Sequence, residues 1–345
     1  MIRKLAILGS TGSIGQNTLD VLRNSSCDVE YEILVLTANN NIDQLCRDVH
    51  EFKPKRAVIV NDKKYLEVKD RLINTETEVC AGKEALIESS NMGADWTMSA
   101  IVGFDGLEPS LASIKSGGTL ALANKESLVC AGDYFLKQAR DFGSILLPVD
   151  SEHNAIFQCL NGESLAAVEK LIITASGGPF RTWPINKIMH ASVDQALAHP
   201  NWSMGARISI DSASMFNKAM ELIEARHLFA LPPEKLEVIV HPESIIHSMV
   251  NFCDGSIIAQ LGSHDMRGAI GYTLNYPVRR PISDQHLDFS TLKKLTFEKP
   301  DFIKFPALKL ANEVMEKGGM FGTVFNAAKE VALDRYIAGE IGFLN

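Results

Sequence analysis

The stretch KLAILGSTGSIGQNTLDVL, residues 4–22, decides the fold of this chain. An apolar run over residues 4–8 leads into a turn with glycine at positions 9, 12 and 15, and a helical pattern follows. Glycine permits the tight turn, and the start of a helix offers N–H groups and a positive dipole end to an anion. This order of strand, glycine turn and helix predicts a dinucleotide-binding unit, although glycines that serve packing alone are an alternative.

The rest of residues 1–150 alternates short apolar runs with helical stretches. Beyond the first run, the predicted strands are Tyr31–Leu36, Ala57–Val60, Trp96–Ala100, Thr119–Ala123 and Ile145–Val149. Such alternation is typical of a doubly wound parallel sheet. We therefore expect an α/β fold whose N-terminal, Rossmann-like domain binds a dinucleotide and covers residues 1–150.

The pattern changes after residue 150, where strands no longer alternate regularly with helices. Further strands are predicted at Leu171–Thr174, Leu236–Val240, Ser244–Asn251 and Ser256–Leu261, the last two around a hairpin turn. We expect an α+β catalytic domain over 151–276 with a flexible loop at about 176–206, a connecting arm over 277–306, and part of a C-terminal helical domain over 307–345.

Composition narrows the class of protein. The 345 residues carry a net charge of −8 and no basic block, which argues against a nucleic-acid partner. The six cysteines are scattered without a Cys-x-x-Cys pair, as expected for reduced thiols in a cytoplasmic protein. Neither a signal peptide nor a membrane-length apolar run is evident, so we expect no membrane partner.

The end of the second predicted strand indicates which dinucleotide binds. An NAD enzyme places an acid there for the ribose diol, whereas this chain has Ala38, Asn39, Asn40 and Asn41. This favours a phosphorylated ribose, hence NADPH. No arginine stands there either, so none of these positions supplies a cationic donor to the ribose phosphate.

Three carboxylates are candidate metal ligands. Asp150 and Glu152 follow an apolar run, at the carboxyl end of a predicted strand, and Glu221 lies in a later helical stretch. Hard oxygen donors of this kind suit Mg²⁺ or Mn²⁺. The alternatives are a helix N-cap with a first-turn acid for Asp150 and Glu152, and a surface pair with Lys218 for Glu221.

The same helical stretch supplies candidate phosphate ligands. Ser214, Asn217, Lys218 and Glu221 have the spacing of one helix face. Ser212 with Asn217 and Lys218 could complete a phosphate site, and Ser176-Gly177-Gly178 could wrap an anion with backbone amides or be a plain loop.

Two further segments could act on the substrate or cofactor. Lys125 follows a predicted strand and could polarise a carbonyl or bind near the nicotinamide, or form a surface pair with Glu126. The segment 199–205, with Trp202, could be a lid that excludes water, or a surface turn.

These segments together resemble the 1-deoxy-D-xylulose 5-phosphate reductoisomerase family of the non-mevalonate isoprenoid pathway. The matching motifs span nearly the whole chain: Gly9–Gly15, Asn124–Ser127, Pro148–His153, Ala175–Phe180, His199–Glu221 and His241–Ser248. The resemblance implies metal-dependent rearrangement and NADPH-dependent reduction of 1-deoxy-D-xylulose 5-phosphate to 2-C-methyl-D-erythritol 4-phosphate. It also implies a cytoplasmic homodimer, and a divalent cation that is Mg²⁺, Mn²⁺ or Co²⁺.

Site roles carry over from the resemblance residue by residue. Lys125, Asp150, Glu152 and Glu221 are the implied catalytic residues, the last three as metal ligands. The implied substrate contacts are Lys125, Ser151, Glu152, Ser176, His199, Trp202, Met204, Ser212, Asn217, Lys218 and Glu221. The implied cofactor contacts are Gly9, Ser10, Thr11, Gly12, Ser13, Ile14, Ala38, Asn39, Asn40, Asn41, Ala100, Asn124, Lys125, Glu126, Gly205 and Met266.

The chain departs from the family pattern in places. Asn39-Asn40 stands where the family often has glycine and a basic residue, and Lys329 stands where it has asparagine. The family also continues for tens of residues, so we expect the C-terminal helical region to be incomplete. A metal-free reductase with a Tyr-x-x-x-Lys pair and a non-catalytic dinucleotide sensor are the alternative functions.

Overall fold

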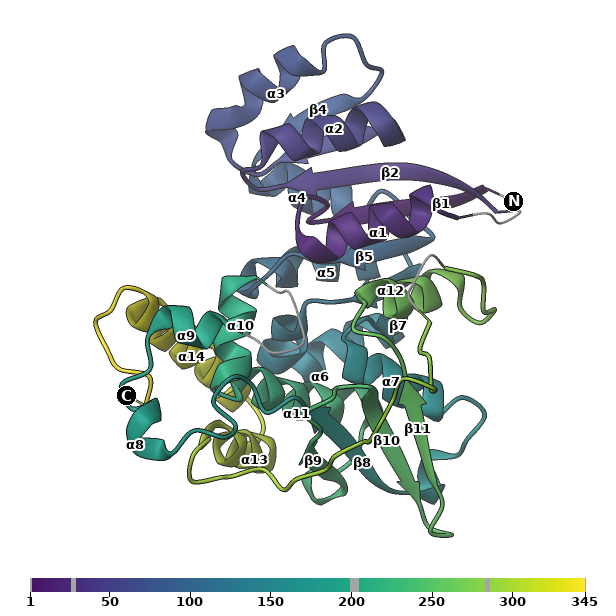
Figure 1. Cartoon of the computed structure of the whole chain (residues 1–345). Coiled ribbons are helices and arrows are strands. Elements are labelled where there is room, and N and C mark those ends of the chain that lie inside the picture. Colours follow the sequence, from purple (N-terminus) through teal and green to yellow (C-terminus); the bar gives the residue numbers. More distant parts are fainter. Residues whose placement is uncertain (1, 26–28, 199–204, 283–285, 345) are drawn as a thin grey trace. The chain divides into compact units, whose positions relative to one another are not determined.

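The computed structural model describes residues 2–25, 29–198, 205–282 and 286–344 (Figure 1). The chain forms two compact units, each built from separate stretches of sequence. The first unit consists of Met1–Ser127, Asp133–Asp150 and Met266–Asp284, and the second of Leu128–Gly132, Ser151–Asp265 and Gln285–Asn345. The predicted domain boundaries at 150, 276 and 306 stay predictions.

The first unit contains a seven-stranded sheet in which every pairing is parallel, in the order β4-β3-β2-β1-β5-β6-β7. Its strands are β1 (Ile2–Leu8), β2 (Glu30–Ala38), β3 (Arg56–Ile59), β4 (Glu78–Ala81), β5 (Trp96–Ser99), β6 (Thr119–Leu122) and β7 (Ile145–Pro148). Its helices are α1 (Ser13–Arg23), α2 (Ile42–Phe52), η1 (Asp62–Lys64), α3 (Tyr65–Arg71), α4 (Gly82–Ser90), η2 (Phe104–Gly106), α5 (Leu107–Ile114), most of α6 (Lys125–Asp141) and α12 (Met266–Asn275). The predicted doubly wound parallel sheet is confirmed.

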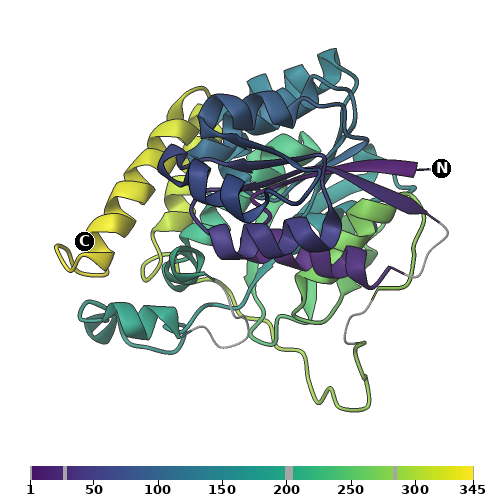
Figure 2. The same ribbon diagram turned by 90° about the horizontal axis from the view of Figure 1, so that it is seen from above.

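Apolar side chains are buried on both faces of this sheet, as a doubly wound fold requires. Leu5 and Ile7 of β1 belong to one buried cluster with residues of α1, α2 and α12, while Ala6 and Leu8 belong to another with Leu86 of α4. Figure 2 shows helices of this unit, in purple and blue, on either side of its strands. With both faces covered, ligands have access at the carboxyl ends of the strands.

The second unit contains a four-stranded sheet of order β11-β10-β8-β9, made of β8 (Val168–Ala175), β9 (Leu236–Val240), β10 (Ile246–Phe252) and β11 (Ile257–Leu261). Its helices are α7 (Ser151–Cys159), η3 (Leu165–Ala167), α8 (Ile185–Ile188), α9 (Val193–Leu197), α10 (Ala206–Ala213), α11 (Phe216–Phe229), η4 (Pro233–Lys235), α13 (Ala307–Lys317) and α14 (Phe321–Ile337). The expected α+β character is confirmed, and the hairpin turn closes with a bond from Gly255 N to the Phe252 carbonyl at 2.9 Å.

Helix α11 runs through the main core of the second unit. Ala219 and Ile223 pack in one cluster with Leu171 of β8, Val250 of β10 and Leu308 of α13. A helix surrounded in this way keeps even its polar side chains inside the protein. The buried charged groups of α11, Lys218, Glu221 and Glu224, must therefore find partners within the core.

The structure differs from the prediction at three elements. The helix predicted to carry Ser214 through Glu221 on one face is broken at Met215, whose φ is 64°, so Ser214 caps α10 and lies outside α11. Strand β4 was not predicted because it has only four residues, none of them buried. Strand β10 begins at Ile246 and not at Ser244, which has a φ of 51°.

Within the described ranges, no helix is long and apolar enough to cross a bilayer.

Candidate active site

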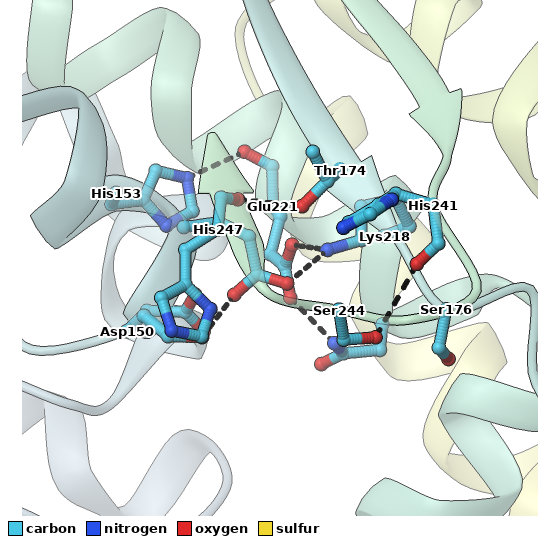
Figure 3. Close-up of polar contacts among 12 residues, drawn as sticks. Asp150, His153, Thr174, Ser176, Lys218, Glu221, His241, Ser244 and His247 are labelled. Carbon is cyan, nitrogen blue, oxygen red and sulfur yellow. Dashed lines mark hydrogen bonds and ion pairs between the residues drawn. The ribbon is translucent and has the colours of Figure 1, made fainter. Parts of the chain in front are cut away.

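The predicted carboxylates Glu152 and Glu221 lie close together in the second unit. Helix α7 carries Glu152 in its first turn, α11 carries Glu221, and carboxylate oxygens of the two come within 4.8 Å of each other. Lys218 of α11 lies between them, and its Nζ donates a hydrogen bond to Glu152 Oε1 at 2.6 Å. The same Nζ donates to Glu221 Oε2, a contact that Figure 3 shows as a dashed line. One ammonium thus serves two carboxylates, which leaves these three groups with a formal charge of −1.

Burial decides against the surface-pair interpretation of Glu221. Lys218 is 4 % exposed and Glu221 1 % exposed. Asn217 adds a further donor, since its side-chain amide hydrogen-bonds Glu221 Oε1, and the Ser151 hydroxyl donates to Glu152 Oε2. Charges held inside a protein in this way must be paired or bound to a metal, so these groups form a built polar site.

Asp150 ends the first unit, two residues before Glu152 in the chain. Its Oδ2 accepts a hydrogen bond of 2.7 Å from Lys125 Nζ at the start of α6. Lys125 and Glu126 are both buried, and Glu126 Oε2 accepts a bond from the Asn124 amide, so the alternative of a surface Lys125–Glu126 pair is wrong. The strand ends at β6 and β7 therefore supply a buried cation and a carboxylate in contact.

A second polar pair joins the two helices that carry Glu152 and Glu221. His153 of α7 has its Nε2 2.9 Å from the Glu221 carbonyl oxygen and its Nδ1 3.4 Å from Glu224 Oε2. Both side chains are buried, and the imidazole stacks on Phe229. Neither His153 nor Glu224 was predicted to have a role. Their positions were a signal, because His153 follows Glu152 directly and Glu224 lies one helical turn after Glu221.

The predicted phosphate residues come from the turn after β8 and from helices α10 and α11. Ser176 follows β8, and its Oγ accepts a bond of 3.2 Å from the amide of Gly178. Gly178 has a φ of 65°, and a Cβ there would meet the Ser212 carbonyl oxygen of α10 at 2.9 Å. The Ser-Gly-Gly turn thus packs directly on the segment that carries Ser212. Asn217 and Lys218 begin the next helix, where both contact Glu221.

In the first unit, packing accounts for the glycines at positions 9 and 15. A Cβ on Gly9, whose φ is 83°, would lie 2.8 Å from the Ala100 carbonyl oxygen, and one on Gly15 would lie 2.4 Å from that of Gly9. Thr37 at the end of β2 fixes the turn, since its Oγ1 accepts from Gly9 N and its carbonyl from Ser10 N, both at 2.8 Å. These contacts account for the glycines at positions 9 and 15 by packing, and the use of the turn for binding an anion stays a prediction.

Gly12 and the first helix are suited to a phosphate group. In the described structure, Gly12 caps α1 without a side-chain bond, and the first turn holds no acid. An anion can therefore approach the amides of the first turn without meeting a competing side chain. Ser10, Thr11, Ser13 and Ile14 lie in this turn and the start of the helix.

The remaining predicted cofactor residues divide between the units. Ala100 and Met266 are half-buried against the core of the first unit, and Asn39 and Asn40 are exposed beyond β2. Asn41 caps α2 by accepting from the amide of Gln44 at 3.1 Å. Gly205 caps α10 in the second unit, whereas His199, Trp202 and Met204 lie outside the described residues.

One pair in the chain does have the Tyr-x-x-x-Lys spacing of metal-free reductases, Tyr65 and Lys69. Both lie in α3, where Lys69 Nζ is 5.6 Å from the centre of the Tyr65 ring. This is a cation–π contact within a single helix. Helix α3 follows β3 and lies away from the carboxyl ends of β5 to β7, so the pair does not indicate a metal-free reductase site.

Comparison with known proteins identifies what the chain is similar to. The family model described as 1-deoxy-D-xylulose 5-phosphate reductoisomerase matches residues 5–132, and two models of its C-terminal domains match 146–229 and 261–345. The reductoisomerase of Rhizobium meliloti (strain 1021) is 54% identical over 342 residues, which cover 99% of this chain and 88% of that protein.

Solved structures of reductoisomerases are similar over nearly the whole chain. The reductoisomerase of Zymomonas mobilis in complex with NADPH has a TM-score of 0.94 and 48% identity, covering 100% of this chain and 89% of that one. A reductoisomerase in complex with NADPH, fosmidomycin and magnesium has a TM-score of 0.94 and 41% identity, covering 99% and 86%.

Proposed function

The chain belongs to the 1-deoxy-D-xylulose 5-phosphate reductoisomerase family, and from this premise we propose which of its residues perform the family's reaction. It is an NADPH-dependent enzyme that converts 1-deoxy-D-xylulose 5-phosphate to 2-C-methyl-D-erythritol 4-phosphate with a divalent cation, in isoprenoid precursor synthesis. The observation that carries the assignment of residues is the buried group of Glu152, Lys218 and Glu221.

Asp150, Glu152 and Glu221 are the proposed cation ligands. The donor set fits, because the oxygens of Glu152 and Glu221 already converge on a cation, the Lys218 ammonium, and Asp150 precedes Glu152 by two residues. When bound, a divalent cation supplies Lewis-acid stabilisation for negative charge that develops on substrate oxygens. Asn217 and Ser151 orient the Glu221 and Glu152 carboxylates by hydrogen bonds, and His153 holds α7 against α11.

Lys218 serves two kinds of anion in turn. Its ammonium neutralises Glu152 and Glu221 here, and it becomes available to the phosphate of the substrate once those carboxylates have another cation partner. Ser176 and Ser212 lie in adjoining segments and complete the proposed phosphate site with Asn217. Binding energy from the phosphate, remote from the reacting carbons, then holds the substrate in position.

NADPH supplies the hydride when bound. Gly9 to Ile14 are proposed to bind its pyrophosphate and Ala38 to Asn41 its adenosine ribose; Ala100, Asn124, Glu126, Gly205 and Met266 are further proposed cofactor contacts. Lys125, which is held by Asp150, is proposed to contact both the cofactor and the substrate. Ser151, His199, Trp202 and Met204 are proposed to line the substrate carbons.

The protein is further proposed to be a cytoplasmic homodimer. The described cysteines are thiols, which suits a reducing compartment. Strand β11 is an edge strand of the second sheet, and its Ile257 and Ile258 are 56% and 39% exposed. An exposed apolar edge invites pairing with another chain, and a second copy supplies the matching surface.

The assay for the proposed function follows NADPH oxidation by its absorbance. With 1-deoxy-D-xylulose 5-phosphate and Mg²⁺ we expect turnover that stops on chelation and resumes when Mg²⁺ or Mn²⁺ is returned. Turnover that continues unchanged after chelation would contradict the cation site, and binding of NADPH without any turnover would favour the dinucleotide-sensor alternative.

A further inference from the structure

The ribose end of the cofactor site lacks a charged residue in the sequence next to β2. In a Rossmann-like sheet the side chain just beyond this strand normally contacts the adenosine ribose. When the ribose carries a 2′-phosphate, a cationic side chain normally binds it there. Ala38, Asn39, Asn40 and Asn41 supply amides but no charge. A cation for the extra phosphate of NADPH must therefore come from another segment of the first unit.

Strand β3 brings such a segment to the same edge of the sheet. It pairs in parallel with β2, and the pairing continues past the strand ends through Val60 N to the Ala38 carbonyl at 2.8 Å and Asn61 N to the Asn39 carbonyl at 3.2 Å. The turn η1 begins directly after this pairing, at Asp62. Its residues therefore lie beside the asparagines that follow β2.

Lys64, the last residue of η1, reaches across to those asparagines. Its Nζ donates a hydrogen bond of 2.6 Å to the Asn40 carbonyl oxygen. Asn61 supports the arrangement, because its amide donates to Asn40 Oδ1 at 2.7 Å while its Oδ1 accepts from Lys63 N at 3.2 Å. The half-buried Lys64 side chain is thus already directed to the position where the ribose is expected.

The charge of Lys64 is available at this position. Among the residues that the structure describes, it forms no ion pair with a carboxylate, and its hydrogen bond goes to the neutral carbonyl of Asn40. The pKa of the Asp43 carboxyl is lowered mainly by the hydrogen bond from Arg71, and the charge of Lys64 is only a minor influence on it. The first turn of α2 holds one acid, Asp43, and Arg71 engages it by a hydrogen bond and ion pair. A phosphate here would meet an ammonium that forms no ion pair in the described residues, and the positive end of α2.

We propose that Lys64 binds the 2′-phosphate of NADPH and sets the preference of this enzyme for NADPH over NADH. The ammonium exchanges the Asn40 carbonyl for a phosphate oxygen, a stronger acceptor because it is charged. The proposal rests on the proposed function and adds a specificity residue from outside the segment that follows β2.

The test compares cofactor binding without substrate, by fluorescence titration of NADPH and NADH, in the wild type, Lys64→Ala, Lys64→Arg and the control Lys63→Ala. Lys63 is the neighbouring, exposed lysine of η1, so Lys63→Ala removes the same charge from the same turn. For Lys64→Ala we expect NADPH to bind about tenfold more weakly and NADH to bind as before. Lys64→Arg should retain most of the preference, and Lys63→Ala all of it.

A wild-type preference that survives in Lys64→Ala, or equal losses for NADPH and NADH, would overturn the proposal while leaving the enzyme's function intact. Equal losses in Lys63→Ala and Lys64→Ala would also overturn it, because they would indicate a general charge effect. A wild type that binds NADPH no better than NADH would contradict the cofactor assignment itself, and with it the role of Lys64.

Discussion

The ammonium of Lys218 donates a hydrogen bond to the carboxylate of Glu221 one helical turn further along α11, and both side chains are buried. The pair joins two sites that the sequence suggests separately, a cation site of carboxylates and a phosphate site of cationic and amide donors. Because one lysine contacts the carboxylates here and is needed for the phosphate, occupancy of the two sites should be coupled.

Lys218→Ala should therefore lower stability in the absence of a divalent cation. Removing one partner of a buried ion pair leaves the other charge uncompensated, at a cost of about 3–5 kcal/mol. We expect the free energy of unfolding in urea to fall by an amount of this order with a chelator present, and Mg²⁺ to restore part of it. Lys235→Ala is the control, because Lys235 Nζ donates a hydrogen bond to the Val168 carbonyl and, in the described structure, forms no ion pair. Equal stability of Lys218→Ala and wild type in chelator would contradict the coupling.

Gly178→Ala should disturb the phosphate site through a steric clash, in addition to the strain of placing alanine at a positive φ. The new Cβ would lie 2.9 Å from the Ser212 carbonyl oxygen, so the Ser176 turn must move away from α10. Gly162→Ala is a matched control, because Gly162 has a φ of 89° and nothing within 4 Å of its Cβ position. We expect Gly162→Ala to cost about 1 kcal/mol of stability and to leave KM unchanged. Gly178→Ala should cost more and raise KM for the phosphorylated substrate; identical behaviour of the two variants would argue against the packed turn.

Acid should weaken the contact between α14 and α10. Burial would raise the pKa of Glu330, but the hydrogen bonds and charges of Lys329 and Arg207 outweigh it and lower that pKa below 4.5. A carboxyl whose pKa is lowered by folding stabilises the protein above its unfolded pKa, and this stabilisation is lost as the pH falls through the folded pKa.

Glu330→Gln should accordingly be about 1 kcal/mol less stable than wild type at pH 7, and the difference should vanish in acid below the folded pKa. Thermal unfolding of both proteins from pH 7 down to pH 3 measures it. A difference that stays constant over this range would show that the charge of Glu330 contributes nothing. Lys329 also donates a hydrogen bond of 3.1 Å to Asp211 of α10, so it links α14 to α10 as well.

Ile257→Lys should shift the proposed dimer toward monomer. A charge placed on an edge strand disfavours pairing with a second chain. Sedimentation velocity over a range of protein concentrations gives the dissociation constant. Ile303→Lys is the control, since Ile303 is 79% exposed and lies outside the sheet. A dimer that survives Ile257→Lys with wild-type affinity would place the interface elsewhere.

Local sequence patterns were enough to predict most of the first sheet. The apolar run before Gly9 and the glycine spacing predicted β1 and α1, and the later apolar runs predicted all strands of the first unit except β4. The prediction failed where the signal is weak, as in a four-residue strand without buried side chains, or where tertiary packing overrides it, as at the helix break of Met215.

Contacts between distant segments could not be predicted from spacing. The pairing of Lys125 with Asp150 depends on the register of β6 and β7, and the contact of Lys64 with Asn40 depends on that of β2 and β3. Burial of Lys218 and Glu221 depends on α11 being enclosed by the core. In each case the partner is set by the fold, which a single sequence specifies only through its long-range packing.

The most direct test of the cation site is the binding of Mn²⁺ to the NADPH-saturated protein, measured by electron paramagnetic resonance of the free ion. Wild type and Glu237→Gln, a control that loses a surface carboxylate of β9 paired with Lys170, should each bind one ion with the same affinity. Glu221→Gln should still bind NADPH, but its affinity for Mn²⁺ should be about 10- to 100-fold lower than that of the wild type. Wild-type affinity for Mn²⁺ in Glu221→Gln would contradict the account.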